Sequence, residues 1–235
     1  DALAGGDAAT SAPPQQPPGP GPRLAPIPLL AERPPSAQPR RRGLPVGLGG
    51  DGARTVTLPA QGGALVVGPP GSGRSTALAH LVRGLALSTT PTTTIARDPG
   101  VLELARAAGP SSDFEAESVL ALLEAAPSTL VVDDLDQLTR LVPQAGDTLD
   151  ALVESGSAVL ASASLDAVLG AYRGTLASLR SRRTGLVLSP LSPGSGEVFG
   201  TPLDWDADPV HPRHPGRGVV QAGARTTPVQ VFAPG

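Results

Sequence analysis

The sequence contains no Cys, no Met, no Lys and no Asn among its 235 residues. Without Cys there is no disulfide and no thiolate metal site, which is compatible with a reducing compartment. All 18 basic residues are Arg, so a single Arg where Lys is usual carries less meaning in this chain. Aromatic residues make up only 2% of the chain, so the core must be built from Leu, Val and Ala.

The chain also lacks an apolar run long enough to span a bilayer and a recognisable signal peptide. Its net charge of −3 is opposite to the basic balance of most duplex-binding proteins, so tight DNA binding by this chain alone is not favoured. The absence of Met and the start at Asp1 predict a piece cut from a longer polypeptide.

Residues 1–42 are rich in Pro, Ala and Gln and show little periodic apolar pattern. Such a composition buries too little surface to offset the entropy that is lost on ordering. We therefore predict a Pro/Ala-rich, partly disordered linker over residues 1–42 and one folded domain over residues 43–235.

From Gly43 onward, short apolar runs of β type alternate with segments of helical spacing. Strands are predicted at 63–68, 92–97, 128–136, 156–164 and 184–190, and helices at 74–88, 99–109, 113–126, 146–155 and 165–181. Asp113 is the expected N-cap of the third helix. Two extended pieces precede this series, and a hairpin turned at Ala222-Gly223 closes it. The alternation predicts an α/β fold with a mainly parallel sheet between helices and a C-terminal β-hairpin.

The segment GPPGSGRST has the spacing of a phosphate-binding loop, G-x-x-x-x-G-K-[ST], with Arg in the place of Lys. In such a loop the backbone N–H groups converge on phosphates, and the following helix adds its positive N-terminal end. The alternative is a Gly-Pro turn that binds nothing. The strand before and the helix after favour a nucleotide site for ATP and Mg²⁺ formed by Gly68, Pro69, Pro70, Gly71, Ser72, Gly73, Arg74, Ser75 and Thr76.

Within this loop the hydroxyl of Ser75 is expected to face Mg²⁺, and that of Thr76 an α-phosphate oxygen. The strand TLVVDDL supplies the second half of the metal site, because Asp133 follows four residues of that strand and can hold Mg²⁺, often through a water. Asp134 is then the candidate catalytic residue that orients a water. The strand AVLASAS would place Ser162 near the γ-phosphate as a polar sensor, or it is an ordinary strand-end hydroxyl.

The order of these segments resembles the FtsK/SpoIIIE family of hexameric motors, and most closely the C-terminal ATPase domain of EccC-like type VII secretion proteins. The resemblance covers residues 43–235 and is carried by LPVGLGG, GPPGSGRST, LVVDD, AYRGTLASLRSRRTGLVLSP and GRGVVQAGARTTPVQV. It implies a RecA-like P-loop core, cytoplasmic placement in a membrane-anchored parent, sibling ATPase domains, a hexameric assembly and docking of a secreted protein substrate.

Two positions depart from an active member of that family. Arg74 is a planar fork where a compact Lys ammonium is usual, although it keeps charge-assisted contacts to phosphate. Asp134 is one methylene shorter than the usual Glu, and a misplacement of about 1 Å costs about 10²-fold in rate. We therefore expect a domain that binds Mg-ATP and hydrolyses it slowly or not at all.

The Arg residues near 180 allow two interpretations. Either Arg180 or Arg183 reaches the γ-phosphate of a neighbouring domain, or both belong to a solvated helix face. The function also has two alternatives to a weak ATPase: an active DNA-translocating motor domain, and a docking module for substrate or partner that does not depend on nucleotide.

Overall fold

The computed structural model describes residues 31–32, 43–50, 52–59, 61–88, 90–190, 192, 194–200 and 214–233. The linker predicted over residues 1–42 therefore lies outside the described residues, apart from Ala31 and Glu32. Ala31 is buried and forms a parallel bridge to Phe232. No helix among the described residues is long and apolar enough to cross a membrane.

The described residues form one ten-stranded sheet in the order β2-β1-β10-β9-β8-β3-β7-β6-β4-β5. The part from β8 to β5 is parallel, and the part from β8 to β2 is antiparallel. The parallel strands are β3 (Ala64–Gly68), β4 (Thr93–Ile95), β5 (Ser111–Ser112), β6 (Thr129–Val132), β7 (Ala158–Ser164) and β8 (Thr184–Leu188). The antiparallel strands are β1 (Leu44–Gly49), β2 (Arg54–Leu58), β9 (Arg217–Ala222) and β10 (Arg225–Val231).

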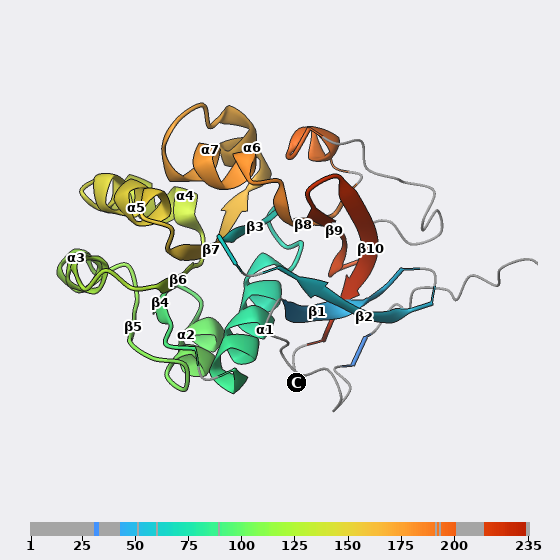
Figure 1. The fold of residues 1–235 in the computed structure, drawn as a ribbon, viewed down its shortest axis with the longest axis horizontal. Helices are drawn as coiled ribbons and strands as arrows, with labels where there is room; N and C mark the ends of the chain where they lie inside the picture. The colour runs from blue at the N-terminus through green and yellow to red at the C-terminus, as the bar shows by residue number, and fades with distance from the viewer. Residues whose placement is uncertain are drawn as a thin grey trace, which may run out of the picture.

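Helices cover both faces of the sheet (Figure 1). One face carries α1 (Arg74–Leu87) and α2 (Pro99–Ala105). The other carries α3 (Ala116–Glu124), α4 (Leu135–Leu141), α5 (Ala145–Glu154), α6 (Leu165–Gly170) and α7 (Gly174–Ser181). A short 3-10 turn follows at Ser195–Glu197. The predicted α/β class, with a mainly parallel sheet between helices, is confirmed.

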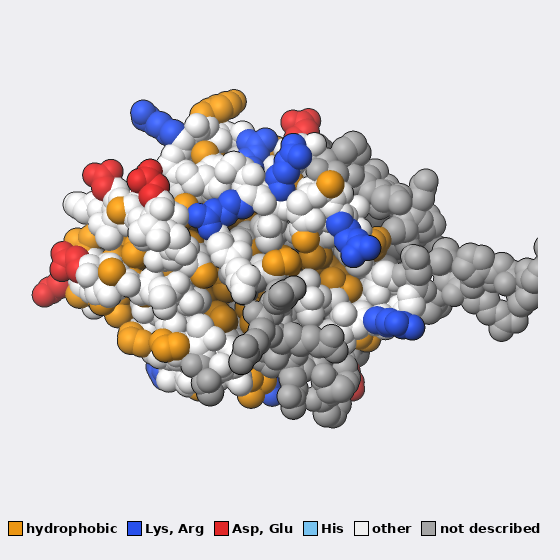
Figure 2. Space-filling model, in the orientation of Figure 1, with side chains coloured by type: hydrophobic (Ala, Val, Ile, Leu, Met, Phe, Trp, Pro, Cys, Tyr) orange, Lys and Arg blue, Asp and Glu red, His pale blue; other side chains and the backbone are white. Residues whose placement is uncertain are grey.

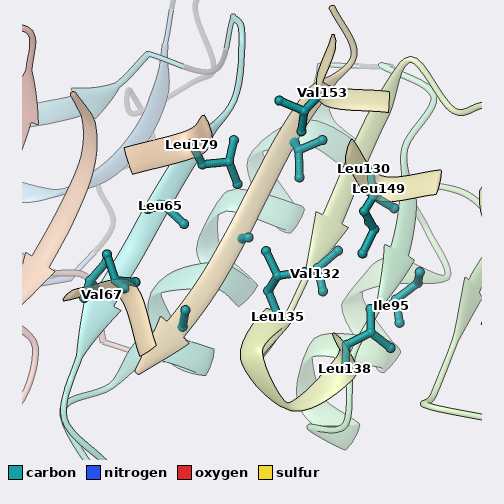
Figure 3. Close-up of a cluster of buried hydrophobic side chains, with 14 of the residues drawn as sticks. Leu65, Val67, Ile95, Leu130, Val132, Leu135, Leu138, Leu149, Val153 and Leu179 are labelled. Atoms are coloured by element: carbon teal, nitrogen blue, oxygen red, sulfur yellow. The ribbon is translucent and has the colours of Figure 1, made fainter. Parts of the chain in front are cut away.

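Apolar side chains from the central strands fill the space between the sheet and each helical layer. In Figure 3, Leu65, Val67, Leu130 and Val132 project from β3 and β6, and Leu149, Val153 and Leu179 project from the helices. All of them are buried. Strands with apolar residues on both faces are typical of a parallel sheet that is covered twice, as the sequence indicated.

Several boundaries differ from the predicted ones. Helix α2 ends at Ala105 and not at Gly109. Helix α3 begins later than expected, and its N-cap is Glu115, whose carboxylate accepts hydrogen bonds from the N–H groups of Glu117 and Ser118. Asp113 instead accepts from the N–H of Glu115, so it closes the turn before the helix. The predicted strand 128–136 ends at Val132. Asp133 follows the strand, and Asp134 is the N-cap of α4, a helix that was not predicted from the sequence.

The predicted helix 165–181 is two helices, because the chain is extended at Ala171 and Arg173 between them. In the closing hairpin Ala222 pairs with Arg225, so the turn residues are Gly223 and Ala224. Strand β9 runs antiparallel to β8, which brings its first residues to the edge of the sheet where β3 and β8 end.

Candidate functional site

The predicted loop joins the carboxyl end of β3 to the first turn of α1. Gly71 and Gly73 have φ angles of 76° and 96°, in the left-handed region that strongly favours glycine. A Cβ on Gly71 would meet no atom within 4 Å, so the space above the loop is open. The loop is tightened by a hydrogen bond from the N–H of Ser72 to the carbonyl of Pro69 at 3.2 Å. Left-handed torsions of this kind are found in the bends whose successive N–H groups bind anions.

Ser72 fixes the inner wall of the bend. Its side chain is buried, and its hydroxyl has no hydrogen-bond partner among the described residues. A Cβ on Gly68 would lie 2.5 Å from this hydroxyl, so Gly68 must be glycine for the loop to close over the strand. An unpartnered buried hydroxyl beside an open amide bend fits a polar ligand at this place.

The metal-binding residues predicted from sequence lie together at the next corner of the site. The hydroxyl of Ser75 donates to Oδ2 of Asp133 at 2.9 Å, and that of Ser162 donates to Oδ1 at 2.6 Å. The N–H of Asp134 donates to the Ser162 hydroxyl at 2.7 Å. These contacts arise because β7 lies between β3 and β6, so the ends of all three strands meet at one edge. Ser162 therefore positions the carboxylate of Asp133.

Asp133 is an acid held in an unfavourable environment for its charge. Its side chain is 1% exposed, and this burial raises its pKa above the ordinary value of 3.8. The nearby charges of Asp134 and Asp98 also raise the pKa, whereas the hydroxyls of Ser162 and Ser75 lower it. A divalent cation would relieve this repulsion. In the described part of the chain no three His, Cys, Asp or Glu side chains form a metal cage, and Mg²⁺ needs only one or two carboxylates besides phosphate and water.

The raised pKa predicts how stability depends on pH without nucleotide. The folded state holds the proton of Asp133 more tightly than the unfolded state, so stability falls as pH rises from 3.8 through the folded-state pKa. Asp133→Asn removes this titration, and we expect the ligand-free variant to melt at a higher temperature than the wild type at pH 7. The difference should shrink as the pH approaches 3.8. A variant that melts lower than the wild type at pH 7 would contradict the expectation.

Arg74 does not extend into the open bend. One guanidinium nitrogen, Nη1, donates to the carbonyl of Gly68 at 2.6 Å, and Nη2 donates to Oδ1 of Asp134 at 2.8 Å. The ion pair is partly buried, with 15% of the Arg74 side chain and 26% of the Asp134 side chain exposed. Asp134 has a φ of 53°, a left-handed backbone that is uncommon for a residue other than glycine. The two residues that depart from the family pattern therefore contact each other.

The two candidate trans-acting residues lie in different environments. The guanidinium of Arg180 donates to the carbonyls of Val198 and Glu197 at 2.7 and 3.0 Å, and more weakly to those of Val168 and Leu169. Arg180 thus joins α7 to neighbouring segments of its own chain. Arg183 is exposed at the amino end of β8, at the opposite edge of the sheet from the loop.

Sequence reasoning missed a cavity next to the loop. It has a volume of about 360 Å³, lies between α1 and α2, and is lined by Ser75, Thr76, Arg83, Asp98, Glu103 and Leu104, among others. Asp98 follows the end of β4, at the same sheet edge as Asp133. The sequence did hold a signal for this part of the site, because Asp98 in ARDPG follows a predicted strand. Only the start of a helix was predicted there.

A second missed contact holds the loop from the side of the C-terminal hairpin. The N–H of Gly216 donates to the carbonyl of Ser72 at 3.3 Å, and a Cβ on Gly73 would lie 3.7 Å from Gly216. Because the C=O and the following N–H of a trans peptide point in opposite directions, the N–H of Gly73 points away from Gly216. The turn before β9 therefore orients the loop.

Gly216→Ala is expected to weaken ATP binding through this contact. Gly216 has a φ of 75°, and its Cβ would meet the Gln230 side-chain nitrogen at 2.8 Å. Alanine in this left-handed conformation costs about 1–2 kcal/mol. If the turn shifts to relieve that strain, the loop loses its contact with residue 216. A loss of similar free energy in ATP binding lowers the affinity by about five- to thirtyfold. The matched control is Gly223→Ala, since Gly223 has a φ of 63° with nothing within 4 Å. If calorimetry gives equal ATP affinities for Gly216→Ala and Gly223→Ala, the contact from Gly216 does not orient the loop.

Comparisons with known proteins place the fold. No protein-family model and no curated protein matches the chain. Among solved structures, the cytoplasmic domain of EssC matches 88% of this chain with a TM-score of 0.69 and 15% identity. The cytoplasmic domain of the Thermomonospora curvata type VII secretion ATPase EccC matches 89% with a TM-score of 0.65 and 19% identity. The pCW3 conjugation coupling protein TcpA, solved with ATPγS, matches 88% with a TM-score of 0.59 and 14% identity.

At these identities the matches show a shared fold. The chain spans 47% of the EssC chain, 28% of the EccC chain and 70% of the TcpA chain, so it corresponds to part of each.

Proposed function

We propose that this chain is an ATP-binding domain of an FtsK/SpoIIIE-type translocase of the type VII secretion kind, and that it hydrolyses ATP slowly or not at all. The observation that carries the proposal is the joint placement of an open glycine bend with the Ser75–Asp133–Ser162 corner beside it. That three strands converge on this corner is a property of the fold, which the chain shares with EssC, EccC and TcpA. The ATPγS of TcpA supports ATP as the ligand.

The loop residues 68–76 would hold the phosphates through the amide groups of the bend. Ser75 and Asp133 would hold Mg²⁺, whose charge offsets the phosphate charge when it is bound. Thr76, in the first turn of α1, would donate to the α-phosphate. Ser162 fixes Asp133 and is 0% exposed, so its part in the site is to position that carboxylate.

Weak hydrolysis follows from the Arg74–Asp134 ion pair. A carboxylate that accepts a charge-assisted hydrogen bond from a guanidinium is a poor acceptor for a water proton, because its charge is already satisfied. The same pair holds Arg74 against Gly68, away from the γ-phosphate position at the open side of the bend. Arg74 and Asp134 thus both lower the expected rate of hydrolysis.

The proposal is tested by titrating the 235-residue chain with ATP and Mg²⁺ in a calorimeter and by measuring phosphate release on the same sample. We expect saturable binding, with little turnover. A ligand that binds only the folded state also raises the melting temperature, and at 100 times the Kd it adds about 2.7 kcal/mol of stability. An unchanged melting temperature would favour the nucleotide-independent docking module, and turnover that DNA stimulates would favour the DNA-translocating motor.

Figure 2 shows Arg side chains dispersed over one face of the molecule, without a continuous basic stripe. Together with the net charge of −3, this favours a protein rather than DNA as the translocated polymer. In the parent protein we place the domain in the cytoplasm beside sibling ATPase domains, with residues 1–42 as its linker. Arg183, exposed at the far edge of the sheet, is the better candidate to reach the nucleotide of a neighbour in a hexamer.

A further inference from the structure

The end of β10 holds the turn that contacts the phosphate loop. The side-chain amide of Gln230 donates to the carbonyl of Pro215 at 2.9 Å, and the N–H of Val231 donates to the carbonyl of Gly216 at 2.9 Å. The turn lies tightly against this strand end, because a Cβ on Gly216 would come within 2.8 Å of the Gln230 side chain. Gly216 in turn donates to the Ser72 carbonyl. The phosphate loop is therefore joined to β10 through Gly216.

The next residues of the chain join the same strand end to a segment far upstream. Phe232 forms a parallel bridge to Ala31, and the N–H of Ala233 donates to the carbonyl of Ala31 at 2.7 Å. Alternate N–H groups along a strand point to the same side, and Ala233 lies two residues beyond Val231. Ala31 and Gly216 therefore occupy the same edge of β10, one after the other.

The contact at Ala31 is a buried one. The side chains of Ala31 and Phe232 are each 1% exposed, and they pack with Leu48 in a small apolar cluster. If the segment at Ala31 left β10, the Ala233 N–H would lose its acceptor and apolar surface of Phe232 would be exposed to water. Both effects loosen the strand end that holds Gly216.

A second route joins Phe232 to the nucleotide site through α1. The rings of Phe232 and His80 meet edge to face, with their centroids 6.0 Å apart. His80 is buried, lies about one turn beyond Thr76, and lines the same cavity as Ser75 and Thr76. A shift of the Phe232 ring is therefore felt on the helix that begins in the phosphate loop.

We propose that Ala31 is a positioning residue of the nucleotide site, an inference that rests on the proposed function. Its docking on β10 holds the Gly216 turn, and through that turn the phosphate loop, in the geometry that binds Mg-ATP. By thermodynamic linkage, bound nucleotide strengthens the docking of Ala31 by the same factor by which docking raises the affinity. Anything that draws this upstream segment away from β10 therefore weakens nucleotide binding.

The first test is Ala31→Glu in the 235-residue chain. A carboxylate in the cluster with Phe232 and Leu48 has no partner there, so the segment leaves β10. We expect the calorimetric affinity for Mg-ATP to fall by about five- to tenfold, at the low end of typical coupling between two sites. The matched control is Ala224→Glu, the same change at the exposed turn of the β9–β10 hairpin, which should bind as the wild type does.

The second test needs no substitution, so it decides the matter even if Ala31→Glu does not fold. Hydrogen exchange of the Ala233 amide, followed by NMR in the wild type, reports directly on the bond to Ala31. Saturating Mg-ATP is expected to slow this exchange by about five- to tenfold. The amide of Gly223, which donates to the carbonyl of Arg183 at 2.8 Å at the far end of the hairpin, should exchange at an unchanged rate.

The outcomes separate this proposal from the proposed function. If the wild type binds Mg-ATP, then an unchanged affinity in folded Ala31→Glu, or unchanged exchange at Ala233, overturns the positioning role and leaves the nucleotide site standing. Equal losses of affinity in Ala31→Glu and Ala224→Glu would also overturn it, as would equal slowing at Ala233 and Gly223, because both show a general effect. If the wild type does not bind Mg-ATP, the proposed function itself fails.

Discussion

Replacing Arg74 with Lys and Asp134 with Glu in the same chain is expected to raise ATP turnover by about 100-fold over the wild type. The structure gives the reason, because these two side chains are hydrogen-bonded to each other at 2.8 Å and to nothing that is expected to react. A Lys ammonium cannot bridge Gly68 and residue 134 as the Arg fork does. A Glu carries its carboxylate one C–C bond further out, about 1.5 Å, toward the open bend.

The single variants are expected to fall short of this gain. Arg74→Lys alone leaves the carboxylate at 134 too short, and Asp134→Glu alone leaves a longer acid that Arg74 still holds. The effects of substituting two residues in direct contact are rarely additive. A double-mutant cycle on the rate of phosphate release therefore measures the coupling between positions 74 and 134. Brisk hydrolysis by the wild type would refute the weak-enzyme interpretation. A double variant that binds ATP but turns over no faster would show that the defect lies elsewhere.

The architecture could be predicted because its causes are local. Apolar runs such as ALVVG and TLVV, separated by helical segments, fit only strands buried on both faces. Gly71 and Gly73 mark backbone torsions that other residues avoid, so the bend was also visible in the sequence. Ser75 and Asp133 were placed together because the carboxyl ends of parallel strands meet at one edge.

The remaining features depend on contacts between distant segments. Asp134 is left-handed in the structure, which no propensity predicts for an aspartate that follows an apolar strand. The hydrogen bond from Gly216 to Ser72 joins residues whose proximity is set by the antiparallel pairing of β8 with β9. The cavity requires α1 and α2 to lie side by side, and their separation depends on packing that no periodicity shows.

The Asp133 corner predicts the largest loss of binding. Asp133→Asn is expected to lower the affinity for Mg-ATP by about 100-fold while changing that for ATP in EDTA much less, because the variant lacks the buried negative charge at the metal position. Ser162→Ala should lower the affinity for Mg-ATP by about tenfold, since outer-shell partners typically contribute about 10- to 100-fold to metal affinity. Calorimetric titrations at several Mg²⁺ concentrations measure both effects.

The same strand supplies the control. Ser164 lies two residues beyond Ser162 on β7, and its hydroxyl donates to Asp136 at 2.8 Å rather than to Asp133. The Ser164 hydroxyl also caps α6, since it accepts from the N–H of Ala167 at 3.3 Å. Ser164→Ala therefore removes a hydroxyl from the same face of the same strand, and with it a helix cap, without touching the metal corner, and its Mg²⁺ dependence should match the wild type. Equal losses in Ser162→Ala and Ser164→Ala would mean that strand stability, not the position of Asp133, limits binding. If the ATP affinity of Asp133→Asn depends on Mg²⁺ as strongly as that of the wild type, the metal is held by other ligands. The proposed metal site would then be wrong.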